Sequence, residues 1–111
     1  MRKKLVFVGD SRKRLLTFPR DLQRDAGHEL LAIQDGDEAS DTKVLVNVAP
    51  GVKEIRLWDE SGTFRFVFVA RFEEAVYVPH AFQRKTQSTS AKDLNLVRQR
   101  YEEVRTFRSK I

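Results

Sequence analysis

Four basic side chains and one histidine in the second half of the chain have the types and spacing to act on a phosphodiester. Arg56 and Arg65 lie in stretches that alternate as β-strands do, His80 lies in the next such stretch, and Arg84 and Lys85 follow it. Guanidinium and ammonium groups bind phosphate oxygens through charge and hydrogen bonds, and histidine exchanges protons near neutral pH. Gathered on one side of a sheet, these groups form a surface for phosphate.

RNA can be cleaved without a metal when the substrate's own 2′-hydroxyl attacks the adjacent phosphate. Such a site needs a base, a cation for the charge that develops on the phosphoryl oxygens, and an acid for the leaving 5′-oxygen. Arg65 fits the cation, and His80 and Lys85 are the candidates for proton transfer or charge. Three further groups are predicted to position RNA: Lys43, Arg56 and Arg84.

Two of these candidates, Arg65 and His80, also have a structural interpretation, and so does the nearby Trp58. Arg65 can form an ion pair with Glu54 across a hairpin, because opposite charges often pair on sheets. His80 also fits a semi-buried position on an apolar strand face. Trp58 is either a packing or partner-contact residue or a platform for an unpaired base.

Composition limits the class of protein. The 111 residues fit one domain, residues 1–111, with one modest core. A net charge of +5 and a pI near 9.8 favour a polyanionic partner. With no cysteine and only two, distant histidines, disulfides and thiolate or zinc sites are excluded, and we expect no metal or other cofactor. Without an apolar run of membrane length or a signal peptide, a cytoplasmic protein with no membrane partner is expected.

The elements that must position these residues predict an α+β domain. The predicted strands span residues 4–8, 53–58, 63–70 and 75–82. Two helices are predicted between residues 10 and 36, and a third follows a capping box made by Ser90 and Asp93. We predict an antiparallel sheet with the N-terminal helix pair and the C-terminal helix packed on one face, which leaves Arg65 on an open face.

Alternation along the predicted strands assigns side chains to faces. Phe64, Phe66 and Phe68 share a face and are predicted to lie in the core, so Arg65 points to the opposite side. On the last strand the same rule assigns one face to Val76, Val78, His80 and Phe82.

Two segments carry a resemblance to a known family, GVKEIRLWDESGTFRFVFV at residues 51–69 and VYVPHAFQRKTQ at residues 76–87. With their flanking segments they resemble the phage-derived, HigB-like toxins of the RelE/ParE superfamily over nearly the whole chain. The resemblance implies a RelE-like domain and a small bacterial toxin that cleaves mRNA on the ribosome without a metal. It also implies a cognate antitoxin, usually with a helix-turn-helix domain, and contact with ribosomal RNA.

Individual residues match the family's pattern. Arg65 matches the arginine after the Gly-aromatic turn, and Arg56 matches the basic position of the preceding strand. His80 matches the family's histidine, and Arg84 and Lys85 match its basic pair. The resemblance thereby implies a role in the site for each of them.

Three positions depart from that pattern. Lys43 matches a family lysine but is followed by Val-Leu rather than Pro-Met, Phe68 replaces a common tyrosine, and Pro79 stands where an aliphatic residue is usual. Phe68 has no hydroxyl, so it takes no acid, base or hydrogen-bonding role. The departures at Phe68 and Pro79 leave open a catalytically degenerate protein that only binds an antitoxin. A non-nuclease inhibitor of DNA gyrase, as in the ParE branch, also stays open, because the same fold serves both kinds of toxin.

Overall fold

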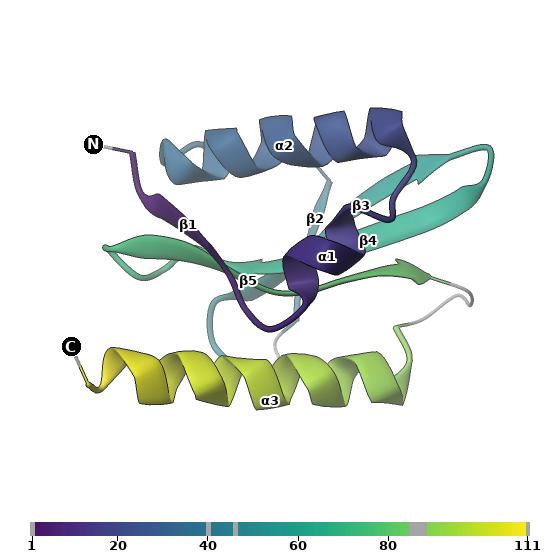
Figure 1. Cartoon of the computed structure of the whole chain (residues 1–111). Coiled ribbons are helices and arrows are strands. Elements are labelled where there is room, and N and C mark those ends of the chain that lie inside the picture. Colours follow the sequence, from purple (N-terminus) through teal and green to yellow (C-terminus); the bar gives the residue numbers. More distant parts are fainter. Residues whose placement is uncertain (1, 40, 46, 85–88, 111) are drawn as a thin grey trace.

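A five-stranded sheet lies between helices on both of its faces (Figure 1). The computed structural model describes residues 2–39, 41–45, 47–84 and 89–110. In chain order the elements are β1 (Lys4–Phe7), α1 (Ser11–Leu15), α2 (Arg20–Gln34), β2 (Thr42–Val44), β3 (Val52–Asp59), β4 (Gly62–Val69), β5 (Ala75–Arg84) and α3 (Ala91–Arg108). The strand order is β1-β5-β4-β3-β2, with β1 parallel to β5 and the other neighbours antiparallel. The predicted α+β class is confirmed, and β2 is an additional edge strand.

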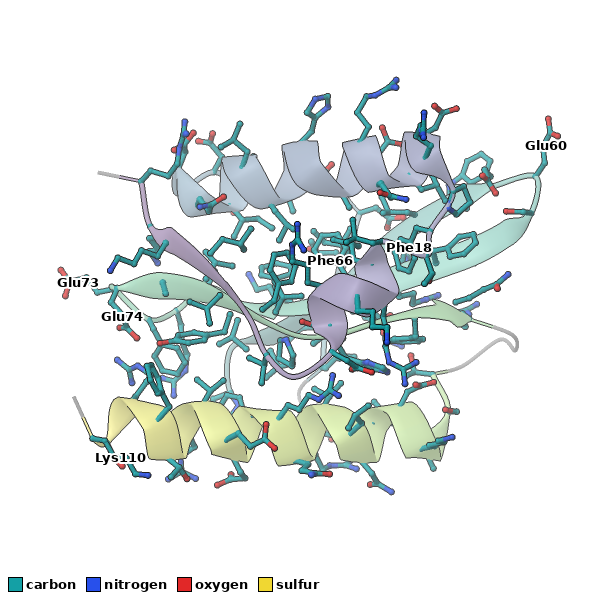
Figure 2. The ribbon with its side chains drawn as sticks, in the orientation of Figure 1. Phe18, Glu60, Phe66, Glu73, Glu74 and Lys110 are labelled. Atoms are coloured by element: carbon teal, nitrogen blue, oxygen red, sulfur yellow. The ribbon has the colours of Figure 1, made fainter. Side chains whose placement is uncertain are left out.

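The face under α1 and α2 is an apolar core. Helix α2 buries one residue per turn against the sheet, namely Leu22, Ala26, Leu30 and Ile33. Phe64, Phe66 and Phe68 of β4 meet them, as predicted, and the rings of Phe18 and Phe64 lie 5.0 Å apart. Figure 2 shows Phe18 and Phe66 in the layer between the sheet and these helices. Burial of these large apolar side chains holds the helix pair on the sheet.

The opposite face of the sheet is covered by α3. This helix turns Val97, Tyr101 and Val104 onto a second core that includes Val67 and Val69 of β4. Figure 1 shows α2 and α3 on opposite sides of the sheet. The prediction that all helices share one face was therefore wrong. The central strands are apolar on both faces, so each face needs a cover.

A β-bulge at Pro79 changes which side chains of β5 face α3. The pairs on either side of the bulge are Val67 with His80 and Val69 with Tyr77. Two residues of β5, Val78 and Pro79, therefore lie opposite one residue of β4, and proline has no N–H to contribute to the ladder. The extra residue reverses the alternation, so Val78 joins the core under α1 and α2 while His80 and Phe82 face α3. The predicted common face for residues 76, 78, 80 and 82 was wrong for this reason.

Helix α3 is fixed at both ends. At its start the Asp93 N–H donates to Ser90 Oγ at 3.1 Å, which is the predicted cap. Near its end the Arg108 guanidinium donates to both Glu74 oxygens, at 2.6 and 3.0 Å, and lies 3.8 Å from the centre of the Phe72 ring. Among the described helices, none has the length and apolar character to span a bilayer.

Candidate functional site

Five of the six predicted site residues lie on the face of the sheet that α3 covers. Strand register arranges this face in three neighbouring rows. The rows are Lys43–Glu54–Val67–His80, then Arg56–Arg65–Phe82, then Trp58–Thr63–Arg84. Directly opposed residues of antiparallel strands share a face, so each row is a line of neighbouring side chains. The sixth predicted residue, Lys85, lies outside the described residues.

Arg65 is buried in the second row. Its side chain is 2% exposed, and its guanidinium forms an ion pair with the carboxylate of Glu54, which is itself fully buried. The other oxygen of Glu54 accepts a hydrogen bond from the Thr89 hydroxyl at 3.0 Å, just before α3. The expectation that Arg65 lies on an open face was wrong. The structure instead contains the alternative, an ion pair between Arg65 and Glu54. In this conformation the Arg65 guanidinium lies inside the protein and is paired with Glu54.

His80 is buried beside the first turn of α3. Its Nε2 lies 2.8 Å from Asp93 Oδ1, and its ring stacks on Phe82 at 4.9 Å between centres. Burial lowers the pKa of His80 below its ordinary value, although the carboxylate of Asp93 acts in the opposite direction. At neutral pH Nε2–H therefore donates to Asp93, and Nδ1, which is buried with no partner among the described residues, carries the lone pair.

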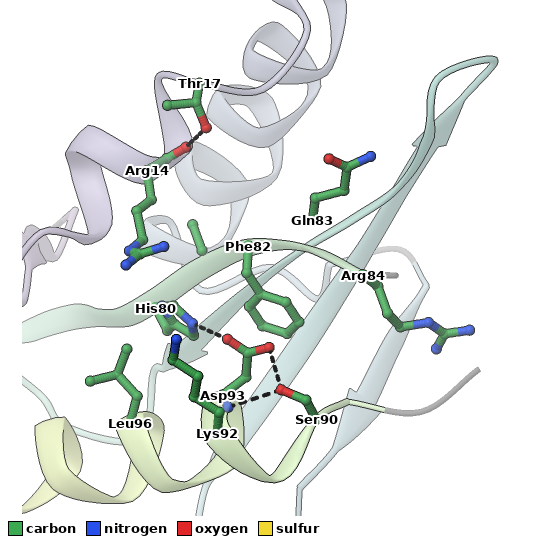
Figure 3. A pocket seen from close by; sticks show the side chains of 11 residues that line it. Arg14, Thr17, His80, Phe82, Gln83, Arg84, Ser90, Lys92, Asp93 and Leu96 are labelled. Carbon is green, nitrogen blue, oxygen red and sulfur yellow. Dashed lines mark hydrogen bonds and ion pairs between the residues drawn. The ribbon is translucent and has the colours of Figure 1, made fainter. Parts of the chain in front are cut away.

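A pocket of about 490 Å³ opens over this pair, between α1, the end of β5 and the start of α3. Its charged lining consists of Arg14, Arg84, Lys92 and Asp93. Arg14 donates to Asp10 at 2.9 Å, whereas Arg84 and Lys92 have no ion pair within the described part of the chain. Figure 3 shows Lys92 and Arg14 close to the His80–Asp93 pair and Arg84 pointing outward. Three cations around one carboxylate form a net positive pocket, which suits an anion such as phosphate.

Hydrogen bonds from one side chain of α3 connect the three elements that surround the pocket, α1, β5 and α3. The Arg100 guanidinium donates to the Pro79 carbonyl at 2.9 Å and to Asp10 Oδ1 at 2.6 Å. Arg100 thus holds the bulge that turns His80 toward α3, and its hydrogen bond lowers the pKa of Asp10. Gly9, at a φ of +57°, lets the chain pass this close to Arg100, because a Cβ there would lie 2.7 Å from the guanidinium carbon.

The predicted RNA-binding residues Lys43 and Arg56 lie at the β2–β3 side of the same face. Arg56 is exposed and forms an ion pair with Asp41, with Nε 3.1 Å from Oδ1. Lys43 is exposed in the first row and lines a separate pocket with Thr89. Lys43 and Arg56 therefore lie next to the buried Arg65–Glu54 ion pair and do not line the pocket beside His80.

The sequence did not predict that Asp93 and Lys92 would line the pocket beside His80. Asp93 was predicted only as part of a helix cap, and nothing in the local pattern indicates that its second oxygen meets His80. Lys92 carried no pattern beyond its charge. The described residues contain no group of three His, Cys, Asp or Glu side chains that could hold a metal ion.

The fold is that of a known bacterial toxin. The solved structure of the E. coli toxin RelE in the free state, as a mutant with two arginines replaced by alanine, superposes with a TM-score of 0.59 over 94% of this chain and 99% of that chain. The two chains are 14% identical, so this similarity concerns the fold. The RelE-like domain implied by the resemblance is thereby confirmed.

The family is set by the sequence match. Residues 13–102 match the family described as phage-derived protein Gp49-like (DUF891), and the chain belongs to that family. The match confirms the phage-derived character of the resemblance, while assignment to its HigB-like members stays a prediction. A search of the curated proteins gave no match.

Proposed function

We propose that the protein is the toxin of a type II toxin–antitoxin system and cuts mRNA on the translating ribosome without a metal. The observation that carries this proposal is the cationic pocket over the Asp93–His80 pair, on a fold shared with the toxin RelE. RNA supplies both its nucleophile and its phosphate, so a base and several cations suffice for the chemistry.

In the proposed reaction the 2′-hydroxyl gives its proton to the Asp93 carboxylate as its oxygen bonds to phosphorus. The bond from phosphorus to the 5′-oxygen breaks, and that oxygen takes a proton from an ammonium, either Lys92 or Lys85. The products are a 2′,3′-cyclic phosphate and a 5′-hydroxyl. Arg84 stabilises the charge on the phosphoryl oxygens. His80 acts through its hydrogen bond to Asp93, because it is too deeply buried to contact the RNA.

Arg65 takes a positioning role in this proposal rather than direct contact with phosphate. It fixes Glu54, which accepts a hydrogen bond from Thr89 at the entry to α3, and α3 carries Asp93. Lys43 and Arg56 extend the positive face along which the mRNA, and the ribosomal RNA around it, would lie. The same positive face would bind an acidic segment of a cognate antitoxin. The affinity of that complex should then fall steeply as the salt concentration rises.

The test is cell-free bacterial translation of one defined mRNA with the purified protein, with 5′ ends mapped by primer extension. We expect new ends only while ribosomes are translating. Asp93→Asn, which preserves size, should reduce cutting by about 100- to 10,000-fold, as loss of a general base does. Asp21→Asn on α2, at an exposed position, is the matched control and should cut at the parental rate. Equal cutting by both variants would exclude Asp93 as the base.

A second candidate is a protein that inhibits by binding, either to DNA gyrase or to an antitoxin alone. The burial of Arg65 against Glu54 favours it, because a guanidinium expected to bind phosphate is already neutralised by a carboxylate. A supercoiling assay with purified gyrase separates the two functions. Intact mRNA together with lost supercoiling would support the gyrase inhibitor, and intact mRNA with normal supercoiling would leave antitoxin binding.

A further inference from the structure

Trp58 is the most exposed large apolar side chain in the described part of the protein. It is 73% exposed on β3, next to the β3–β4 turn, and it is the chain's only tryptophan. By contrast, the phenylalanines of β4 and β5 are buried. No ring contact of Trp58 occurs among the described residues. A single exposed apolar side chain needs no partner by itself, so the neighbours of Trp58 decide whether it belongs to a site.

The neighbours of Trp58 on its own face are polar and cationic. Thr63 and Arg84 complete its row, and Arg56 precedes it on the same side of β3. Since adjacent strands are about 4.8 Å apart, Trp58 and Arg84 lie roughly 10 Å from each other across Thr63. The other exposed large apolar residues, Leu16, Leu31, Val44 and Phe107, belong to other elements.

Arg84 connects this row to the pocket. Its side chain lines the pocket that contains Asp93, and it has no ion pair among the residues that the structure describes. Arg84 therefore lies between the pocket over the Asp93–His80 pair and the exposed ring of Trp58. An apolar protein partner needs a patch of apolar neighbours, which Trp58 lacks. A single-stranded nucleic acid needs an aromatic platform with positive charge nearby, and Trp58 and the unpaired Arg84 provide both.

We propose that the Trp58–Thr63–Arg84 row is a subsite for single-stranded RNA, in which Trp58 stacks on a base and Arg84 binds an adjacent phosphate. The choice of RNA rests on the proposed function. The subsite would hold a nucleotide next to the one in the pocket, and stacking would tolerate any base because each presents a π-face. It therefore adds affinity and register to a site whose chemistry lies at Asp93.

The single tryptophan makes this subsite directly measurable. We expect a short unstructured RNA to quench the fluorescence of Trp58 in the full chain. An abasic oligonucleotide of the same length and charge should bind more weakly and leave the fluorescence unchanged. In anisotropy titrations with labelled RNA, Trp58→Leu should weaken binding about 10- to 100-fold, and Trp58→Phe should retain most of the affinity. Phe107→Leu, at an exposed aromatic of α3, is the matched control and should bind as the parent does.

The outcomes separate this subsite from the proposed function. RNA that binds without quenching, or a Trp58→Leu variant that binds RNA as tightly as Phe107→Leu, overturns the subsite whatever happens to mRNA cutting. Quenching by RNA in a protein that leaves mRNA intact supports the subsite and rejects the nuclease. Quenching by an acidic peptide but not by RNA overturns the subsite in favour of a protein partner.

Discussion

The two faces of the sheet are built from different chemistry. The face under α1 and α2 buries apolar side chains along its whole length. The face under α3 buries mainly apolar residues at one end, around Val69 and Tyr101, and at the other end it buries charged or polar groups between Val67 and Phe82. Glu54, Arg65 and His80 are all buried there, at the end that holds the pocket.

This difference separates stability from function. Burying a charge costs desolvation energy, and an ion pair recovers that energy only in part, so an apolar pair of similar shape would often stabilise a protein as well or better. The apolar face thus contributes stability, whereas the polar end of the α3 face holds groups in a fixed geometry. The candidate site lies at this polar end, where the fold buries charged groups despite their desolvation cost.

The sharpest test of the comparison is to remove one charge of the buried pair. Glu54→Gln keeps the side chain's shape but leaves the Arg65 charge unpaired in a dry environment. We expect a loss of about 3–5 kcal/mol in the free energy of unfolding, measured by urea denaturation. Replacing both partners, with Glu54→Leu and Arg65→Met, should be close to neutral or stabilising.

The next residue along β3 is the control for the apolar face. Ile55 is as buried as Glu54 but points to the other side of the sheet. Ile55→Val should cost about 1 kcal/mol, through one lost methylene and a small cavity. If Glu54→Gln cost no more than Ile55→Val, the two faces would be energetically alike and the contrast between them would fail.

Most of the fold could be predicted because it depends on local pattern. The Phe64, Phe66 and Phe68 alternation and the Ser90 cap are each set by residues a few positions apart, and both were confirmed. The side of the sheet taken by α3 could not be predicted. Both faces of β4 and β5 carry apolar side chains that a helix must bury, and which helix covers which face is decided only once the sheet is assembled.

The candidate site was only partly predictable for a related reason. Strand alternation predicted the side of Arg65 correctly, but it failed at His80 because the bulge at Pro79 inserts one residue. Burial is also a tertiary property, so the charge of Arg65 could be read from the sequence but its neutralisation by Glu54 stayed one of two alternatives. Asp93 joined the site only once α3 was placed over β5.

A smaller effect follows from the titration of His80. Burial lowers the pKa of His80 in the folded protein, so the unfolded chain binds the proton more readily. Its stability contribution is complete above the ordinary histidine pKa of about 6.5 and is lost as the pH falls through the folded value. We expect the free energy of unfolding to fall between pH 7.5 and pH 5, by no more than about 1.4 kcal/mol per pH unit from this group.

The measurement compares the parent with His80→Phe, whose ring can still stack on Phe82. That variant should show a flatter dependence on pH, because no proton is taken up at this position. Parallel curves for the parent and His80→Phe would show that protonation of His80 does not contribute to the pH dependence of stability.

The smallest effect is expected at the opposite end of α3, where the charges are exposed. Glu74 and Arg108 are each about one-third exposed, at 36% and 34%, and the hydrogen bond from Arg108 lowers the pKa of Glu74 to about 2. Because the folded pKa is depressed, the pair's stabilisation is present above the ordinary glutamate pKa and is lost as the pH falls toward about 2. Water and salt screen such a pair, so Arg108→Met should lower stability less than Glu54→Gln or Ile55→Val does, and most of that loss should disappear at high salt. A loss that persists at high salt would instead assign Arg108's contribution to its packing on the Phe72 ring, 3.8 Å away, and would make this end of the helix depend on contact rather than charge.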